Sequence, residues 1–204
     1  MNTHLFVASL YDALMVPADK LGFEQVRRMV VRNATGKVLE IGAGTGLNFK
    51  HFDGAKCVFA TEPDPYMLSH AVTRLRNCSA LTQAKAEELP FPDDSFDTVV
   101  STLTFCTIGD PLKAAKEVKR VLKPDGCFYF AEHPIADKPI LAKAERFATP
   151  VWKRLAGGCH LDRDILSYFK SAGLIVSDII RLDSFFVAGK AAKSEACAKP
   201  ELAA

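Results

Sequence analysis

Three glycines at alternate positions, placed directly after an apolar run, constrain the fold of this chain more than any other feature. Residues 37–46 read Lys-Val-Leu-Glu-Ile-Gly-Ala-Gly-Thr-Gly. Glycine has no Cβ atom, so it can adopt positive φ and let the backbone approach a ligand closely. Open α/β sheets bind their ligands at the carboxyl ends of the strands. We therefore predict a strand, a ligand-binding turn and a helix over residues 47–52. A plain tight turn is the alternative interpretation.

Strand-like and helix-like patterns alternate along the middle of the chain. Apolar spacing predicts helices over residues 65–76 and 110–123, the second with Asp110 as its N-cap and Pro111 in its first turn. Runs rich in β-branched or aromatic residues predict strands at residues 37–41, 57–61, 96–101 and 126–131. This alternation predicts an α/β fold with a doubly wound, mostly parallel sheet that carries helices on both faces.

The C-terminal part follows a different pattern. A turn over residues 123–126 ends the second helix, and a short helix is predicted over residues 165–170. Two apolar runs, residues 174–180 and 185–188, then predict strands joined by a short turn. We expect an antiparallel hairpin at this end of the sheet. Residues 191–204 are rich in Ala and Lys, and we expect them to form a flexible tail.

Two carboxylates narrow the kind of ligand. Glu40 directly precedes the glycines, where it would repel a pyrophosphate but suit an amino group. Leu47 stands where the dinucleotide-binding pattern requires its third glycine, which disfavours an NAD-dependent dehydrogenase. Glu62 ends the second predicted strand, where a carboxylate can accept hydrogen bonds from both hydroxyls of a ribose. On its own, Glu62 would be interpreted as a solvated turn residue. Together the features describe S-adenosylmethionine, a nucleoside with an amino-acid end and no phosphate.

The sequence resembles the class I S-adenosylmethionine-dependent methyltransferases. Within them it is similar to the branch of the ubiquinone and menaquinone biosynthesis methyltransferases (methyltransferase type 11). The matching motifs follow one another in order, at residues 38–46, 62–68, 86–97 and 117–126. Glu132-His133, Trp152 and residues 157–163 are similar to a narrower subgroup, the thiol S-methyltransferases and phospholipid N-methyltransferase-like proteins. The resemblance implies a seven-stranded Rossmann-like fold, S-adenosylmethionine as cofactor and S-adenosylhomocysteine as product.

The resemblance also implies a set of cofactor-binding residues. They are Glu40, Gly42, Ala43, Gly44, Gly46, Glu62, Pro63, Met67, Ala86, Glu87, Thr102 and Leu103. It implies that Glu40 lies near the ammonium of the methionine part and that Glu62 holds the ribose. Thr102 and Leu103 are expected to border the sulfonium.

On the adenine side the sequence departs from the family pattern. The resemblance implies that Pro63 and Met67 pack near the adenine and that Ala86 and Glu87 lie at its edge. The branch often has an acidic residue directly before that alanine, where this chain has Lys85. The contact to the adenine amino group is therefore open, with Glu87 as the nearest substitute.

We expect one domain over residues 1–190. It would consist of an N-terminal helical lid (1–36), a cofactor core (37–133), and an acceptor region with the terminal strands (134–190). The methyl acceptor would lie against the lid and the acceptor region, outside the shared core.

Two histidines are the candidate catalytic residues. His133 or His160 can act as a general base for a thiol, amine or hydroxyl, because imidazole titrates near neutral pH. A hydrogen-bonded structural histidine is the alternative for each. Cys159 is expected to be a buried thiol, and no metal site is predicted because no ligand cluster has metal spacing.

Three other residues of the acceptor region have open roles. Arg163 either braces its loop or meets an anionic group of the substrate. Phe147 and Trp152 are expected in the core, and a platform under the substrate is the alternative. Apolar residues at near-helical spacing in residues 5–14 suggest a helix packed on the sheet edge, or a lid with weak peripheral membrane contact.

Charge and composition exclude several classes of partner. The chain has 26 basic and 24 acidic residues, and it lacks the basic tract expected of a nucleic-acid-binding protein. No apolar run approaches the roughly 20 residues that span a bilayer, so no transmembrane segment is predicted. The six cysteines include no C-x-x-C pair, and residues 5–10 make a poor signal peptide, so we expect reduced thiols and a cytoplasmic location.

The sequence therefore predicts a methyltransferase that moves a methyl group to a small thiol, a lipid amine or a quinone-like ring carbon by in-line displacement. It would be a monomer or a homodimer. The alternative is a non-catalytic scaffold or S-adenosylmethionine-binding protein that keeps the fold.

Overall fold

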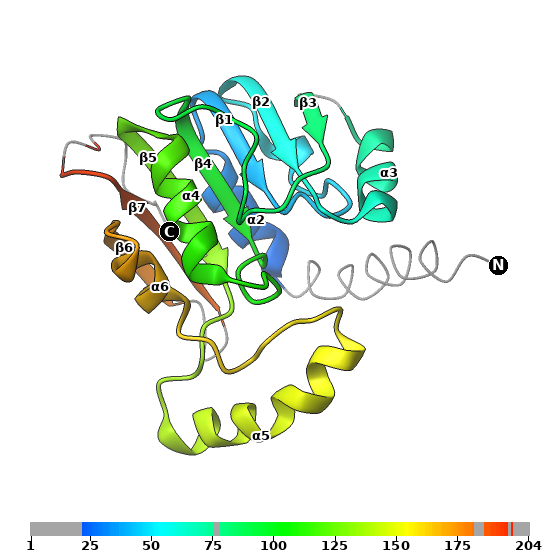
Figure 1. Cartoon of the computed structure of the whole chain (residues 1–204), viewed down its shortest axis with the longest axis vertical. Coiled ribbons are helices and arrows are strands. Elements are labelled where there is room, and N and C mark those ends of the chain that lie inside the picture. Colours follow the sequence, from blue (N-terminus) through cyan, green and yellow to red (C-terminus); the bar gives the residue numbers. More distant parts are fainter. Residues whose placement is uncertain (1–21, 76–77, 182–185, 196, 198–204) are drawn as a thin grey trace.

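A seven-stranded sheet with the order β3-β2-β1-β4-β5-β7-β6 organises the chain (Figure 1). The computed structural model describes residues 22–75, 78–181, 186–195 and 197. The strands are β1 Gly36–Ile41, β2 Ala55–Thr61, β3 Cys78–Thr82, β4 Phe96–Thr102, β5 Leu122–Glu132, β6 Ile175–Arg181 and β7 Val187–Ala192. Strands β1 to β5 pair in parallel, whereas β7 runs antiparallel to both β5 and β6. The predicted α/β class and the antiparallel C-terminal hairpin are confirmed.

The central strands carry apolar side chains on both faces because helices cover both. Successive residues of a strand point to opposite faces, so Val38 and Leu39 enter different apolar clusters. One cluster includes residues of α4 (Pro111–Val121) and α6 (Ile165–Ser171). The other includes residues of α2 (Glu24–Val31), η2 (Phe49–His51) and α3 (Pro65–Thr73). Such burial on both faces is typical of parallel sheets. The pairing of the strands places the ends of β1, β2 and β4 next to one another, where the site lies.

Helix α5 (Pro139–Leu155) is placed differently from the other helices. Among the described residues, neither apolar cluster of the sheet includes a residue of α5. Figure 1 shows α5 as a separate layer beside one end of the sheet, between β5 and α6 in the chain. In the described part of the chain, no helix is long and apolar enough to cross a membrane.

Two local predictions were wrong, and one strand was missed. The helix expected over residues 47–52 is a series of turns followed by the short 3-10 helix η2, because the buried side chain of Asn48 bonds to neighbouring strand ends. Strand β3 was not predicted. Residues 123–126 belong to β5, which begins at Leu122 immediately after α4, and not to a turn.

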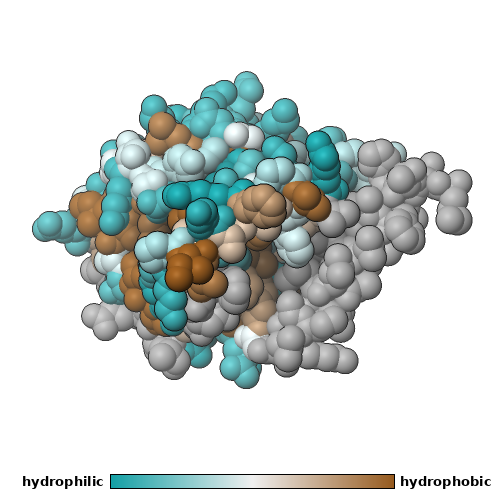
Figure 2. Space-filling view, turned by 90° about the horizontal axis from the view of Figure 1, so that it is seen from below, coloured by the Kyte–Doolittle hydropathy of each residue, from teal (hydrophilic) through white to brown (hydrophobic). Residues whose placement is uncertain are grey.

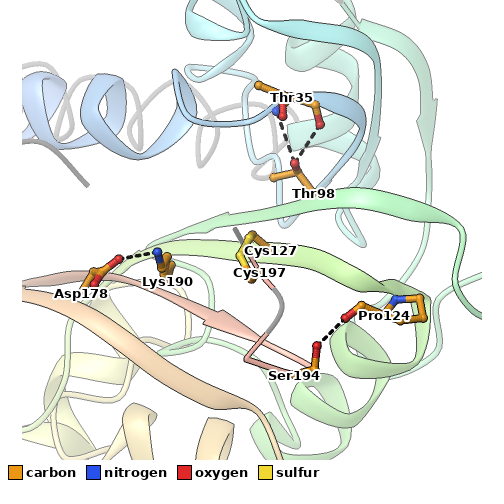
Figure 3. Close-up of a disulfide and its surroundings, with 8 residues drawn as sticks. All are labelled: Thr35, Thr98, Pro124, Cys127, Asp178, Lys190, Ser194 and Cys197. Atoms are coloured by element: carbon orange, nitrogen blue, oxygen red, sulfur yellow. Dashed lines mark hydrogen bonds and ion pairs between the residues drawn. A yellow bond between two sulfur atoms is a disulfide. The ribbon is translucent and has the colours of Figure 1, made fainter. Parts of the chain in front are cut away.

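The C-terminal segment is held to the sheet further than expected. Strand β7 runs on to Ala192, two residues beyond the predicted domain limit. Figure 3 shows the disulfide between Cys127 on β5 and Cys197, 70 residues apart, and the hydrogen bond of 2.9 Å from Ser194 Oγ to the carbonyl of Pro124. The expectation of reduced thiols throughout is therefore wrong for this pair, because the chain after β7 turns back along β5. Most of the predicted lid, residues 1–21, lies outside the described residues.

Candidate functional site

The turn after β1 has the open backbone that its three glycines predicted. Gly42, Gly44 and Gly46 have φ values of 65°, 56° and 81°. A Cβ atom at Gly42 would lie 2.2 Å from Cγ2 of Thr104, so only glycine allows this close packing. A Cβ atom at Gly44 would meet no atom within 4 Å. The backbone of Gly44 therefore faces open space that a ligand can fill.

Glu62 ties the end of β2 to the glycine turn. Its Oε2 accepts a hydrogen bond of 2.9 Å from the backbone N–H of Gly44, and its Oε1 accepts one of 3.0 Å from that of Asp64. The backbone N–H of Ala43 donates to the carbonyl of Thr61 at 2.9 Å. Burial raises the pKa of Glu62, and the two backbone hydrogen bonds oppose the rise. The structure thus brings together two parts of the predicted cofactor site, from adjacent strands.

Glu40 is a fully buried carboxylate with one oxygen left over. Its Oε1 accepts a hydrogen bond of 2.7 Å from Asn48 Nδ2, and its Oε2 has no hydrogen-bond partner among the described residues. Burial raises the pKa of Glu40 to about 8. Asn48 Nδ2 also donates to Thr102 Oγ1 at 2.9 Å, and Arg27 Nη1 donates to the same oxygen at 3.1 Å. Asn48 and Arg27 were not predicted, since neither stands in a motif.

Leu103 follows β4 in a backbone conformation that is unusual for its side chain. Its φ is 53°, in the left-handed region that non-glycine residues rarely adopt. Its N–H donates to the carbonyl of Ala131 at 2.8 Å, and the next residue, Thr104, donates from Oγ1 to the carbonyl of Ile41 at 3.3 Å. Strain of this kind clusters at ligand sites. The segment of residues 103–108, called the post-β4 loop below, therefore lies directly against the glycine turn.

Glu132 holds the post-β4 loop in place. It ends β5, is fully buried, and accepts hydrogen bonds from the backbone N–H groups of Thr104 and Phe105 at 3.0 and 3.1 Å. The hydroxyl of Ser101 also donates to it. Burial raises the pKa of Glu132 to about 7 despite these bonds. The sequence had pointed to the Glu132-His133 pair, but it assigned the chemistry to the histidine alone.

The two candidate catalytic histidines lie in different surroundings. The ring of His133 packs edge-on against that of Phe186, with 5.9 Å between centroids. The backbone N–H of His160 donates to the carbonyl of Cys106 at 2.8 Å, which places His160 beside the post-β4 loop. Its Nδ1 lies 3.5 Å from Asp162 Oδ1, and burial lowers the pKa of the imidazole.

Arg163 and two thiols join the acceptor region to the post-β4 loop. Arg163 Nη1 donates to the carbonyls of Phe105 and Ile108 at 2.7 and 2.6 Å, so of its two predicted roles the structure shows the brace. Cys159 interacts with the buried thiol of Cys106, which itself donates to the carbonyl of Leu103 at 3.6 Å. The neighbouring Cys106, together with Trp152 and the charge of Arg163, lowers the pKa of Cys159 to about 7, while the same pairing and burial raise the pKa of Cys106.

On the adenine side, Glu87 already has backbone partners. Its Oε1 accepts hydrogen bonds from the N–H groups of Gly109 and Asp110 at 3.1 and 3.2 Å. Ala86 is buried and Met67 is half-buried. The carboxylate therefore supports the segment before α4, and a contact to the adenine would be an additional role for Glu87.

The two remaining residues of that side are exposed. Lys85, which departs from the family pattern, has an exposed side chain. Pro63 is exposed too, and its carbonyl accepts a hydrogen bond of 3.1 Å from Gln83 Nε2. Within the described ranges, no group of three His, Cys, Asp or Glu side chains could hold a metal ion.

The arrangement fits a ligand with an ammonium at one end and a ribose in the middle. The unpartnered oxygen of Glu40 suits a cationic donor, since a buried carboxylate oxygen is costly to leave without a partner. The free lone pairs of the Glu62 carboxylate suit hydroxyl donors. The open space at Gly44, whose N–H bonds to Glu62, leaves room for the body of the ligand.

The chain is similar in sequence to known methyltransferases. Residues 39–130 match the family described as methyltransferase domain. The thiol S-methyltransferase TMT1B of Rattus norvegicus is 33% identical over 151 residues, which cover 70% of this chain and 61% of that protein. The phosphatidylethanolamine N-methyltransferase of Cereibacter sphaeroides is 33% identical over 116 residues, covering 54% of this chain and 57% of the other.

A solved structure has a similar fold. The YcgJ protein of Bacillus subtilis is similar with a TM-score of 0.65 and 26% identity, over 78% of this chain and 69% of that one. The chain spans about three fifths of the length of the rat relative, at 61%. The match to the methyltransferase domain, at residues 39–130, includes the glycine turn, Glu40 and Glu62.

Proposed function

Since the chain belongs to the class I S-adenosylmethionine-dependent methyltransferase family, with its methyltransferase domain at residues 39–130, we propose that this protein transfers a methyl group from S-adenosylmethionine to a small-molecule acceptor. One observation carries the proposal. Two buried carboxylates, Glu40 and Glu62, stand at the ends of adjacent parallel strands beside the glycine turn, in which Gly44 has open space where a side chain would lie. A pyrophosphate ligand would be repelled by this pair.

Each carboxylate has a defined task in the proposal. Glu40 would hold the ammonium of the methionine part through its unpartnered oxygen, with Asn48 fixing the other oxygen. Glu62 would hold the ribose hydroxyls while its hydrogen bond to Gly44 keeps the turn in register. When bound, S-adenosylmethionine supplies an electrophilic methyl group on a sulfonium.

The rest of the chain's task is alignment and exclusion of water. Methyl transfer is an in-line displacement, so its rate depends on holding the acceptor on the axis of the reacting bond. We propose that the post-β4 loop borders the reacting methyl group, with Thr102 and Leu103 nearest to it. Glu132 acts as a positioning residue, because it fixes that loop through backbone N–H groups.

We propose His160 as the first candidate for a general base and His133 as the second. His160 lies beside the post-β4 loop, and its lowered pKa keeps the imidazole neutral and able to accept a proton at pH 7. His133 packs against Phe186. A base with a lowered pKa predicts that the rate falls on acidification with its midpoint below the ordinary imidazole value, and that His160→Ala removes this pH dependence.

The acceptor is proposed as a thiol, a lipid amine or a quinone-like ring carbon. Thiol and lipid-amine acceptors are what the names of two relatives state for those proteins. Near-neutral overall charge favours a small or lipid-like acceptor over a nucleic acid. We also propose a monomer or homodimer, and weak peripheral membrane contact.

A cytoplasmic location is part of the proposal and has its own test. Cytosolic reductants keep thiols reduced. In a cytoplasmic protein the disulfide that the structure shows between Cys127 and Cys197 should be reduced, so protein trapped from freshly lysed cells should carry both as free thiols. Recovery of the intact disulfide would place the protein in an oxidising compartment.

Two measurements test the function in sequence. Calorimetry with S-adenosylmethionine and S-adenosylhomocysteine tests the site, and we expect dissociation constants on the order of micromolar. A screen of thiols, lipid amines and quinols, with products detected by mass, tests turnover. Binding without any turnover would favour the non-catalytic scaffold, whereas absence of binding would overturn the proposal.

A further inference from the structure

Helix α5 presents large apolar side chains to the outside. Ile140 is 84% exposed, Phe147 89%, Val151 62% and Trp152 44%. The first three follow a helical spacing of seven and four residues, which places them along one side of the helix. The expectation that Phe147 and Trp152 belong to the core is wrong. Phe147 lies opposite the buried side of α5, and Trp152, on the flank of the helix, is partly exposed. The outward row of Ile140, Phe147 and Val151 is called the α5 apolar stripe below.

The inward side of α5 is small and polar. Ala142, Glu145 and Thr149 are buried. The carboxylate of Glu145 accepts a hydrogen bond of 2.8 Å from the backbone N–H of Ala136, and the hydroxyl of Thr149 donates to the Glu145 carbonyl at 2.7 Å. The Thr149 bond lies within α5, so of these two bonds only that of Glu145 joins the helix to the preceding segment, and the large apolar side chains take part in neither.

All charges on the exposed part of α5 are positive. Lys143, Arg146, Lys153 and Arg154 are exposed. The only acidic residue within the helix is Glu145, which points inward. Figure 2, viewed from the side on which α5 lies, shows brown apolar side chains among teal hydrophilic ones on this face. An apolar stripe next to basic residues, with no exposed carboxylate, is typical of helices that lie in a membrane interface.

We propose that α5 is a docking surface for an anionic lipid bilayer. The α5 apolar stripe would enter the boundary between headgroups and acyl chains, and the lysines and arginines would contact lipid phosphates. Charge complementarity favours this partner, because the four exposed basic side chains of α5, with no exposed carboxylate within the helix, match a negatively charged lipid surface. The placement agrees, since a helix that lies apart from the sheet can enter a fluid bilayer along its length (Figure 1).

Docking through α5 would orient the protein on the membrane. The helix leads into residues 156–163, where His160 and Arg163 bond to the post-β4 loop. A bilayer under α5 would therefore lie on the side of the molecule where we expect the acceptor. Only this statement about the acceptor rests on the proposed function; the binding itself does not.

Trp152 allows a direct test with the full chain, because it is the only tryptophan. Vesicles of phosphatidylcholine alone are compared with vesicles that also contain phosphatidylglycerol. We expect a blue shift of the fluorescence and co-sedimentation with the anionic vesicles, roughly tenfold weaker binding to the neutral ones, and loss of binding as salt is raised. No blue shift and no co-sedimentation with anionic vesicles would overturn the proposal.

Variants assign the binding to the helix. Phe147→Ser with Val151→Ser should weaken binding at least tenfold, and Lys143→Gln with Arg146→Gln should weaken it to a similar extent. Val72→Ser and Lys116→Gln, at exposed positions of α3 and α4, are the matched controls and should bind as the unchanged protein does. Thermal melts confirm that each variant folds.

Two other occupants of the stripe give different results. If a second copy of the chain or another segment of it covers the α5 apolar stripe, vesicles will not bind, and Phe147→Ser will change the sedimentation coefficient or the thermal melt instead. Either result overturns the proposal. Neither result affects the calorimetric test of the cofactor site, so the two proposals fail separately.

Discussion

The carboxylate of Glu62 accepts a hydrogen bond of 2.9 Å from the backbone N–H of Gly44, so the residue proposed to hold the ribose also fixes the turn that receives the methionine part. One side chain thereby links the turn after β1 to the end of β2. Because the bond joins two strands that are parallel neighbours, its loss should be felt in binding more than in folding.

The first prediction concerns Glu62. Glu62→Ala should weaken S-adenosylhomocysteine binding by about 10- to 100-fold, the effect of losing hydrogen bonds to a charged group. Calorimetry measures this loss, and Glu62→Gln should retain part of the affinity. Glu88→Ala, at an exposed position nearby in the chain, is the control and should bind normally. An unchanged affinity in Glu62→Ala would remove Glu62 from the site.

The second prediction concerns protons taken up or released at Glu40. Its pKa of about 8 means that the carboxyl is mostly protonated at pH 7 in the free protein. An ammonium bound beside it favours the charged form, so binding should release roughly one proton at pH 7 and should strengthen from pH 6 to pH 8. Calorimetry in buffers of different ionisation enthalpy measures the released proton. Glu40→Gln should release none, and equal release in both proteins would contradict the assignment.

The same shifts predict how stability depends on pH in the absence of ligand. The folded-state pKa values of Glu40 and Glu132, about 8 and about 7, lie above the ordinary value for a glutamate. The folded state therefore binds more protons than the unfolded state. Stability from these groups is fully present below about pH 4.5 and is lost as the pH rises to 8. Urea unfolding at several pH values tests this, and Glu40→Gln with Glu132→Gln should flatten the profile.

The fourth prediction concerns Glu132 as a support for the post-β4 loop. Glu132→Ala leaves the buried N–H groups of Thr104 and Phe105 without their acceptor, which should cost about 3 kcal/mol of stability. Glu132→Gln keeps an acceptor oxygen and should recover part of that loss. Urea unfolding gives both values, with the exposed Asp125→Ala as the control. A cost below about 0.5 kcal/mol, typical of surface changes, would contradict the role.

The fifth prediction concerns the reactivity of Cys159. Its pKa of about 7 and its half-buried position predict that iodoacetamide modifies it before the buried Cys106, whose pKa is raised. The rate should rise through pH 7 and level off above it. Peptide mapping after short exposure identifies the modified thiol. In Cys106→Ala the pKa of Cys159 should return upward, because the neighbouring thiol that lowers it is gone, and the rate at pH 7 should fall.

Much of the cofactor side could be predicted because the residues that matter are close in sequence and carry a pattern. The glycine turn and Glu62 follow strands whose apolar runs are easily recognised. Arg27 and Asn48 could not be predicted, since Arg27 reaches Thr102 across 75 residues and no periodicity reports such a contact. The expected helix over residues 47–52 failed for the same reason, because Asn48 bonds sideways to two strand ends.

The acceptor side was harder to predict. A sequence pattern shows which residues share one face of a helix, but not whether that face packs against the core or is exposed. The spacing of Ile140, Phe147 and Val151 is equally compatible with a core helix, and only the structure shows that it faces outward. Spacing also says nothing about thiols. Cys127 and Cys197 come together through the turn after β7, whereas Cys106 and Cys159 meet because Arg163 holds their two loops together.

The separation of α5 from both apolar clusters has an evolutionary consequence. Residues on its outer surface contribute nothing to the packing of the sheet, so their replacement leaves the cofactor core and its stability unchanged. Selection can therefore alter where the protein resides or what it admits without a compensating change elsewhere in the chain. The helix is accordingly the natural segment to exchange when the same catalytic core is to be directed to a different surface.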